Sequence, residues 1–427
     1  MRNVLSVTLG LFAGFSAAAP PPPTPEAVKP LAAYITRLKD LERGRYFKLL
    51  AAQAIRDHYK GRSLDAVPAL IEALGDALDN PSVGRDIPLA WAIGQAAEGA
   101  GPERLPIICQ MTTNTDPRVR TGAYGLWLFA IRDLNANGER KDAVVDRKDL
   151  LAGIRRGVKD PSPLVRGHAL ELAQGFWDAP PDAVAEVMPI LIAALDDGAQ
   201  PKIDTHSPAW HAACLLQGFK AKAKPAIPAL ARATASDDNQ LADIACRALL
   251  SIAQSDPSTV KEVVAIFRTI VTNKSRPADA RVLAVGGLSL DPAALRAAVP
   301  DLVAAAEEPG GSDSLQMAAI GALKKCGPGA AAAVPMLIRQ LGRDGPRPNA
   351  ESDLPTEVEQ RENPFLRLLV HERVRAASVR RQAILEVIRA IGPAAAPAAD
   401  AVEKWTHMGD ADVVAAARKT LAAIRKQ

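Results

Sequence analysis

The chain has 427 residues, of which 48% are hydrophobic and only 4% aromatic, and 52 basic against 48 acidic residues give a net charge of +4. This length exceeds what one ordinary globular core accommodates, so the chain forms either several domains or one array of repeats. An alanine-rich composition with few aromatic residues favours packed helices over β-sheet. The near balance of charge argues against a nucleic-acid-binding protein.

The N-terminal segment 1–18 has the pattern of a secretory signal peptide. Arg2 supplies the positive start, residues 4–15 are apolar, and small residues precede Ala18. We expect cleavage after Ala18 and an exported protein, periplasmic or extracellular; the alternative is an uncleaved amphipathic start. Residues 19–26 are proline-rich and predict an extended tether. No later stretch approaches the roughly 20 apolar residues that span a bilayer, so no transmembrane segment is expected in the mature chain.

From residue 27 to the C-terminus the sequence predicts a series of helical hairpins. The first hairpin has helices at 31–41 and 46–59 and diverges from the others, as expected of an end repeat. Further along, one phrase recurs in which an apolar residue directly precedes a proline and another apolar residue stands two positions after it. The prolines of this phrase are Pro68, Pro106, Pro189, Pro228, Pro300 and Pro335. Their spacing gives a period of roughly 35–42 residues, which is typical of a helical repeat array.

Each repeat has a physical explanation. The proline suits the first turn of a helix, where its missing N–H would have no partner. The following apolar residues recur at helical spacing and end in a turn such as Asp116-Pro117 or Asp237-Asp238. The second helix is expected to be closed by a glycine. These glycines are Gly94, Gly218, Gly327 and Gly392.

An Arg-x-x-Ala pattern marks the second helix in four repeats. The pairs are Arg120/Ala123, Arg166/Ala169, Arg281/Ala284 and Arg380/Ala383. The turn aspartate and proline, the Val-Arg, the alanine and the endings Cys326-Gly327-Pro328 and Ile391-Gly392-Pro393 resemble HEAT repeats, especially the bacterial phycobilisome-lyase-like kind. The resemblance implies an all-α fold, an α-solenoid (superhelix) of about nine to ten HEAT-type hairpins, with the second helices along its concave wall.

The four ladder arginines, Arg120, Arg166, Arg281 and Arg380, allow two interpretations. They could line a basic groove, or each could pair with the aspartate of its own turn, which is the interpretation we favour. Trp91, Trp127, Trp177 and Trp210 also fall in second helices. Most are expected to fill the core, although one or two on the concave wall would be natural anchors for a partner.

Two weak metal patterns are present. The segment Asp133-x-Asn135-x-Asn137-Gly138 imitates the start of a calcium loop, but Val144 stands where a bidentate carboxylate is needed. His206 and His211 lie near Asp204, but a five-residue spacing does not place two imidazoles on one helical face. We expect no metal and no cofactor.

The four cysteines, Cys109, Cys214, Cys246 and Cys326, are too sparse for a disulfide scaffold and are expected to be buried free thiols. No nucleophile elbow, phosphate-binding loop or HExxH motif occurs, so no catalytic residue is assigned.

The array is interrupted by an insertion at about 343–369. It opens with glycine and prolines, becomes acidic, and is followed by a basic stretch. Long loops in repeat arrays are either functional or disordered. The insertion is therefore either a gate that competes with an acidic partner or a solvated linker. The candidate partner-binding residues are Arg367, Arg373, Arg375, Arg380 and Arg381.

Together these features favour a non-enzymatic scaffold that binds another protein outside the cytoplasm, with no nucleic-acid partner expected. Two alternatives remain. The first, which the resemblance implies, is a bilin lyase-like enzyme. The second, also by resemblance, is a nucleic-acid-binding HEAT-like protein. The sequence identifies neither the partner nor the oligomeric state.

Overall fold

A computed structural model describes residues 29–40, 45–79, 87–132, 146–200, 206–343, 364–408 and 411–425. In these ranges the chain is all-α, with no strand. It divides into two compact units, Met1–Leu230 and Ala231–Gln427. The expected signal peptide and tether, the calcium-like loop, Asp204 and residues 344–363 of the insertion lie outside the described residues.

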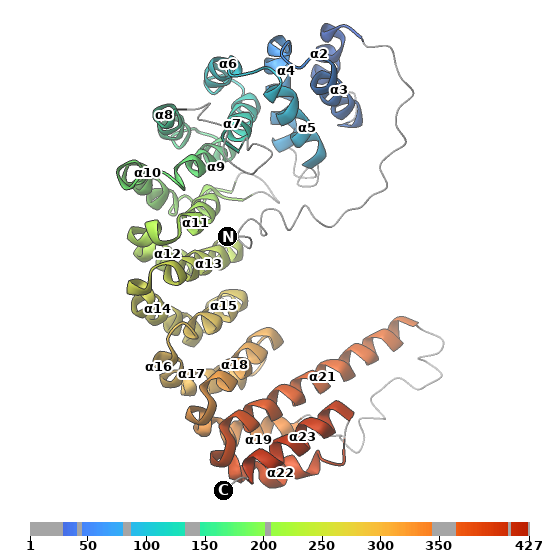
Figure 1. The fold of residues 1–427 in the computed structure, drawn as a ribbon, viewed down its shortest axis with the longest axis vertical. Helices are drawn as coiled ribbons and strands as arrows, with labels where there is room; N and C mark the ends of the chain where they lie inside the picture. Colours follow the sequence, from blue (N-terminus) through green and yellow to red (C-terminus); the bar gives the residue numbers. More distant parts are fainter. Residues whose placement is uncertain are drawn as a thin grey trace. The chain divides into compact units, whose positions relative to one another are not determined.

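The first unit is a stack of five antiparallel hairpins among its described residues (Figure 1). Their helices are α2 (Leu31–Lys39) and α3 (Arg45–His58), α4 (Val67–Asp79) and α5 (Ile87–Glu98), α6 (Arg104–Met111) and α7 (Pro117–Arg132), α8 (Arg147–Gly157) and α9 (Pro163–Glu171), α10 (Pro181–Ala194) and α11 (Pro208–Phe219). The second helices form one row, in which α3 packs on α5, α7 on α9 and α9 on α11. Neither helix of a hairpin buries its apolar stripe alone, so the stacking completes the core.

The second unit repeats this arrangement. Its helices are α13 (Asn239–Ser255), α14 (Val260–Thr272) and α15 (Ala278–Leu288), α16 (Pro292–Ala297), α17 (Val299–Ala306) and α18 (Asp313–Cys326), α19 (Val334–Arg343) and α21 (Pro364–Ile391), α22 (Ala399–Lys404) and α23 (Ala411–Ile424). The second helices again pack in a row, from α13 through α15, α18 and α21 to α23. The division between the units falls within α12 (Ile227–Ala233), which precedes α13.

The predicted fold class is confirmed: by chain order the described helices make ten hairpins of an α-solenoid. The expected helices of the first hairpin agree with α2 and α3 to within two residues. Helix α21 begins at Pro364, so residues 364–369 of the expected insertion are helical. Within the described residues no helix is both long and apolar enough to cross a membrane.

One proline of the repeat phrase does not start its helix. Pro189 lies inside α10, which begins eight residues earlier at Pro181. In three other repeats a 3-10 helix separates the preceding turn from the first helix: η1 (Leu64–Ala66), η4 (Lys220–Ala226) and η6 (Gly327–Ala333). In α10 a second proline at the first helical position supplies the start, so Pro189 is carried into the interior.

Two of the four expected closing glycines have another role. Gly327 and Gly392 follow their helices at φ +55° and +72°, as predicted. Gly94 and Gly218 instead lie within α5 and α11. A Cβ on Gly94 would lie 2.6 Å from the ring of Phe129, and one on Gly218 would lie 2.6 Å from the ring of Trp177. These two glycines therefore make room for aromatic rings of the neighbouring repeat, Phe129 in α7 and Trp177 in the turn after η3 (Leu172–Phe176).

Candidate interaction surfaces

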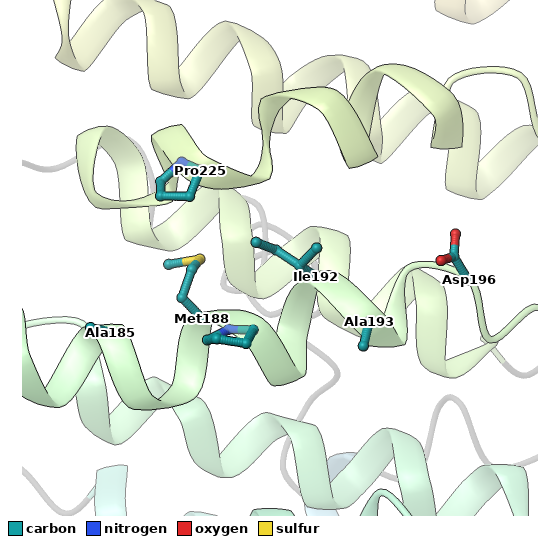
Figure 2. Close-up of a pocket in the computed structure, with 7 residues that line it drawn as sticks. Ala185, Met188, Ile192, Ala193, Asp196 and Pro225 are labelled. Carbon is teal, nitrogen blue, oxygen red and sulfur yellow. The ribbon is translucent and has the colours of Figure 1, made fainter.

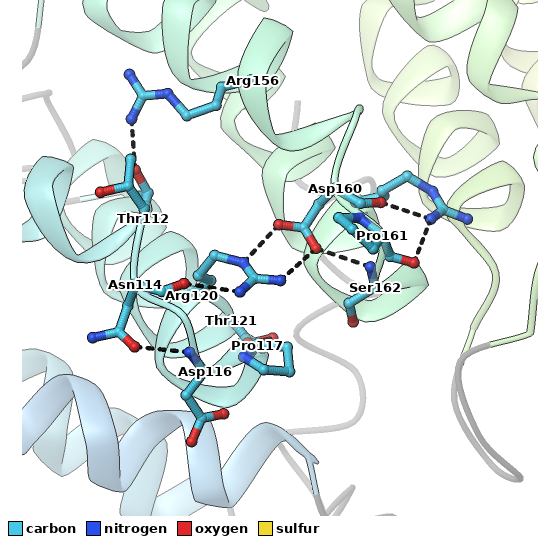
Figure 3. A network of polar contacts seen from close by, with 12 residues as sticks. Thr112, Asn114, Asp116, Pro117, Arg120, Thr121, Arg156, Asp160, Pro161 and Ser162 are labelled. Atoms are coloured by element: carbon cyan, nitrogen blue, oxygen red, sulfur yellow. Dashed lines mark hydrogen bonds and ion pairs between the residues drawn. The ribbon is translucent and has the colours of Figure 1, made fainter.

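Arg120 of α7 joins two consecutive repeats (Figure 3). Its Nη1 donates to the carbonyls of Asn114 and Thr115 in the turn before α7, at 2.8 and 3.0 Å. Its Nε and Nη2 donate to both carboxylate oxygens of Asp160, in the turn of the next repeat, at 2.7 and 2.8 Å. The two side chains are only 14% and 10% exposed. This geometry is the bidentate arginine–carboxylate pair, the strongest form of such a contact.

Arg166 and Arg281 repeat the arrangement. Arg166 binds the carbonyl of Asp160 and both carboxylate oxygens of Asp197, at 2.6 and 3.0 Å. Arg281 is buried, donates twice to the carbonyl of Val271, and binds both oxygens of Glu308 at 3.1 and 2.7 Å. Hydrogen bonding to Arg281 lowers the pKa of Glu308.

The expected pairing of each arginine with its own turn aspartate is therefore wrong in detail. Asp116 accepts from the backbone N–H of Arg118 at 2.9 Å and pairs with the Arg118 side chain. The Asp116 carboxylate caps the N-terminus of α7. The Arg120 side chain does not pair with Asp116 and instead extends to Asp160 of the next repeat. Arg120 and Arg166 contact their own turns through backbone carbonyls.

Arg380 departs from this pattern. Its Nη2 donates to Gln316 of α18 in the preceding repeat, and its Nη1 lies 4.0 Å from Asp313. Arg380 therefore contacts the preceding repeat and not the next one. Because Asp313 is 94% exposed, the Arg380–Asp313 ion pair contributes little to stability. Among the described contacts the Arg380 Nε has no hydrogen-bond partner.

The basic residues of α21 do not share one environment. Arg381 lies over the ring of Trp405 at 4.8 Å, which is a cation–π contact with the last hairpin. Arg375 is exposed. The side chains of Arg367 and Arg373 lie outside the described part of the chain. Arg380 and Arg381 both contact neighbouring repeats.

Of the two histidines that the sequence suggested as metal ligands, only His211 lies beside a carboxylate, in a half-buried cluster with His168 and Glu171. The Nδ1 atoms of His168 and His211 lie 3.5 and 3.1 Å from the Glu171 carboxylate. Burial alone would raise the pKa of Glu171, but the two imidazoles hold this pKa well below its usual range. His206 stacks on Trp210 with 3.7 Å between ring centroids. Among the residues that the structure describes, no three His, Cys, Asp or Glu side chains are placed to hold a metal ion.

The tryptophans differ in exposure, and of the four cysteines, expected to be buried, Cys246 and Cys326 are buried whereas Cys109 and Cys214 are half-buried. Trp127 is buried and stacks on Tyr124, whereas Trp91 is 53% exposed. Tyr46 and Phe47 of α3, the helix beside α5, are 55% and 47% exposed. We call these three side chains, which lie on the adjacent helices α3 and α5, the exposed aromatic group. All four cysteines are free, and burial raises the pKa of Cys246 to about 12.

A groove lies between α10 and η4 (Figure 2). Its volume is about 420 Å³. The lining residues are Ala185, Met188, Pro189, Ile192, Ala193, Asp196 and Pro225. Asp196 is its only charged lining residue; Figure 2 shows Asp196 at one end of the row of α10 residues, Ala185 at the other, and Pro225 across from Met188.

The turn η4 contains a backbone conformation that favours glycine. Lys220 has φ 54° and ψ −129°, nearly the same as Gly327 at 55° and −133°. It is the one non-glycine residue with positive φ in the described part of the chain. Sequence reasoning missed this turn because it assigned the closing position to Gly218. Alignment of Phe219-Lys220 with Cys326-Gly327 and Ile391-Gly392 would have revealed it.

No protein-family model matches the chain, and no curated protein matches it. Solved structures do resemble it. A crystal structure of a Kap121p mutant matches with a TM-score of 0.53 at 13% identity, covering 94% of this chain and 41% of that one. Kap121p bound to Nup53p matches with a TM-score of 0.52 at 13% identity, covering 92% and 40%. The chain thus spans about two fifths of Kap121p, and at this identity the likeness shows the solenoid fold alone.

Proposed function

We propose that the chain is a non-enzymatic scaffold that binds another protein, and that it does so outside the cytoplasm. The observation that carries the proposal is the exposed aromatic group Tyr46, Phe47 and Trp91 on the adjacent helices α3 and α5. Aromatic residues dominate the energy of protein interfaces, and exposed groups of them mark binding sites.

The register of these helices supports a common surface. Arg56 of α3 donates to the Gln95 side chain of α5 at 2.9 Å, and Gly61 donates to the Gly99 carbonyl at 2.6 Å. The helices therefore run in parallel, and Trp91 stands about one and a half helical turns from the level of Phe47. Rigid helices that hold large side chains in place reduce the entropy lost on binding.

Two further observations bear on the class of partner. Three of the four ladder arginines have their guanidinium groups paired with carboxylates of the next repeat, which disfavours a basic groove for nucleic acid. The structure of Kap121p bound to Nup53p has a solenoid of this type with a protein ligand. The signal-like N-terminus supports action outside the cytoplasm.

The test uses the mature chain as bait in the extracytoplasmic fraction of its source cells, with chemical cross-linking. We expect one protein to be recovered by the wild type and lost with Trp91→Ala. The matched control is Met408→Ala, which removes an exposed apolar side chain (43% exposed) from the last hairpin. Equal recovery of the partner by wild type, Trp91→Ala and Met408→Ala would contradict the role of the aromatic group. If cell fractionation finds the scaffold itself in the cytosol, the proposed location is wrong.

A further inference from the structure

Tyr46 and Trp91 stand on one face of the first two hairpins. Asp57 follows Tyr46 after about three helical turns, so both residues lie on the same side of α3. Trp91 and Gln95 are one turn apart on the same side of α5. Arg56 joins these two sides, because its side chain binds the Asp57 carboxylate at 2.6 Å and the Gln95 side-chain oxygen at 2.9 Å. The two exposed rings therefore belong to one surface.

The surface between the two rings is apolar. The register of the helices places Trp91 roughly 9–10 Å along the axis from the level of Tyr46. Leu49 and Leu50 occupy this interval and are half-buried. Phe47 packs edge-on against Tyr46, with 6.1 Å between the ring centroids. The strip thus has an aromatic ring at each end, and each ring brings one hydrogen-bond donor, the Tyr46 hydroxyl and the Trp91 indole N–H.

An extended proline-rich segment has the chemistry that such a strip recognises. A polyproline II helix makes no internal hydrogen bonds, so its carbonyls remain open to donors, and its rings pack on aromatic side chains. Adjacent helices lie about 8–10 Å apart, which puts the backbone positions of Tyr46 and Trp91 roughly 13 Å from each other. Four to five residues of polyproline span about 12–16 Å. One short proline-rich segment can therefore contact both rings.

The chain itself carries a segment of this kind directly before the first hairpin, with prolines at positions 20–23 and 25. The structure fixes where this segment joins the fold. The backbone N–H of Lys29 donates to the Tyr34 hydroxyl at 3.2 Å, and the Lys29 carbonyl accepts from the Tyr59 hydroxyl at 2.5 Å. These two tyrosines hold Lys29 beside the C-terminal end of α3, so the proline-rich segment starts close to the aromatic surface.

The lengths agree. From the level of Tyr59, the axis of α3 runs about 10 Å to the level of Trp91 and about 20 Å to Tyr46. In an extended chain Pro25 lies about 12 Å and Pro20 about 28 Å from the anchored residue 29. The prolines therefore cover the interval in which the two rings lie, with length left to pass around the helix.

We propose that the exposed aromatic group binds the chain's own proline-rich segment, residues 20–25, and that a partner protein must displace this segment. The proline rings lie on Tyr46 and Trp91, and the proline carbonyls accept from the Tyr46 hydroxyl and the Trp91 N–H. Attachment through Lys29 keeps the segment at an effective concentration in the millimolar range, so weak contacts are enough to hold it. This inference rests on the proposed function, because it assigns an internal competitor to the same surface.

The experiment measures, by fluorescence polarisation, the binding of a labelled peptide of residues 19–28 to the mature chain. In one variant the prolines at 20–23 and 25 are replaced by glycine, which removes the competitor and keeps the length. We expect this glycine variant to bind the peptide at least about tenfold more tightly than wild type. Adding Tyr46→Ala or Trp91→Ala should weaken its binding at least about fivefold. The matched control, Met408→Ala in the last hairpin, should leave the affinity unchanged.

Equal binding of the peptide by wild type and the glycine variant would overturn the assignment. Unchanged affinity after Tyr46→Ala and Trp91→Ala would overturn it too, as would equal binding of a peptide with serine at every proline position. Sedimentation velocity tests for a second copy as the occupant: dimers of wild type that the glycine variant does not form would overturn the internal contact.

The cross-linking capture separates this inference from the proposed function. We expect the glycine variant to recover more of the partner than wild type. If the peptide binds as described but no partner is captured, the internal contact stands and the scaffold function fails. If a partner is captured through Trp91 but the peptide does not bind, the scaffold function stands and the internal contact fails.

Discussion

Arg120 reaches past the aspartate of its own turn and binds Asp160, 40 positions later in the chain, through two hydrogen bonds of 2.7 and 2.8 Å. Asp160 at the same time accepts from the backbone N–H of Ser162 at 2.9 Å, so one carboxylate holds the turn before α9 and also binds the arginine of the preceding repeat. The pair therefore couples the local turn to the stacking of hairpins. This explains why a charged residue recurs at one position of an otherwise apolar interface.

We expect Arg120→Ala to lower the free energy of unfolding of the first unit by about 2–3 kcal/mol, because Asp160 and two turn carbonyls lose their donor. In a double-mutant cycle with Asp160→Ala the coupling energy should be about 1–2 kcal/mol. Urea unfolding followed by circular dichroism measures both. The control is Arg118→Ala, whose pair with Asp116 has side chains 46% and 32% exposed and should contribute less than about 0.5 kcal/mol. Equal losses for the two arginines would show that burial and stacking do not matter.

The general fold could be predicted because the evidence for it is local. Proline at a helix start, apolar residues at helical spacing and a polar turn each mark a hairpin without knowledge of its neighbours. The structural importance of the arginines was also visible in their recurrence. Their partners were not, because the distance from Arg120 to Asp160 depends on how two hairpins stack. Sequence neighbours such as Asp116 were the nearest carboxylates along the chain but not in space.

The groove and the turn η4 could not be predicted from the sequence, for a different reason. The groove lies where Pro189 falls in the interior of α10 and η4 packs beside that helix. Neither fact follows from the repeat phrase, which placed Pro189 at a helix start. The position of Lys220 was hidden because Gly218 stood two residues earlier as a more usual closing residue. A ring of Trp177 occupies the space over Gly218, and that contact comes from a residue 41 positions earlier.

The pair Arg281–Glu308 should make the stability of the second unit depend on pH. Hydrogen bonding to Arg281 lowers the pKa of Glu308, so the folded state favours the ionised carboxylate. This stabilisation is fully present above the unfolded pKa of about 4.3 and is lost as the pH falls through the lower folded value. We expect Glu308→Gln to melt below wild type at pH 7, with the difference shrinking steadily below about pH 4.5. A difference that is constant from pH 7 to pH 3 would contradict the role of ionisation.

Lys220 should carry a measurable backbone strain. Replacement by glycine is expected to raise the free energy of unfolding by about 1 kcal/mol, since glycine adopts positive φ freely. The mirror experiment is Gly392→Ala in the equivalent turn, where φ is +72° and a Cβ would meet nothing within 4 Å. Because space is available, the expected loss of about 1–2 kcal/mol comes from the backbone alone. If Lys220→Gly instead lowers the free energy of unfolding, the Lys220 side chain stabilises the fold by more than its backbone strain costs.

Adjacent glycines in α15 provide the sharpest test of helix packing. A Cβ on Gly287 would lie 2.2 Å from the ring of Phe267 in α14, whereas a Cβ on Gly286 would meet nothing within 4 Å. Gly287→Ala must therefore displace a buried ring and separate two helices of one hairpin, and we expect a loss of about 2–3 kcal/mol. Gly286→Ala fills open space on the same helix and should gain about 0.5–1 kcal/mol from helix propensity.

Both α15 variants change hydrogen to methyl in one helix, so composition and unfolded-state effects nearly cancel between them. Phe267→Leu in the Gly287→Ala background offers a second measurement, because a smaller side chain gives the new methyl group room. We expect it to restore part of the lost stability, a non-additive result typical of residues in contact. Urea unfolding of wild type, Gly287→Ala, Phe267→Leu and the double variant gives the coupling energy between the two positions. If Gly286→Ala and Gly287→Ala have the same effect, the close approach of Phe267 does not hold α14 and α15 together.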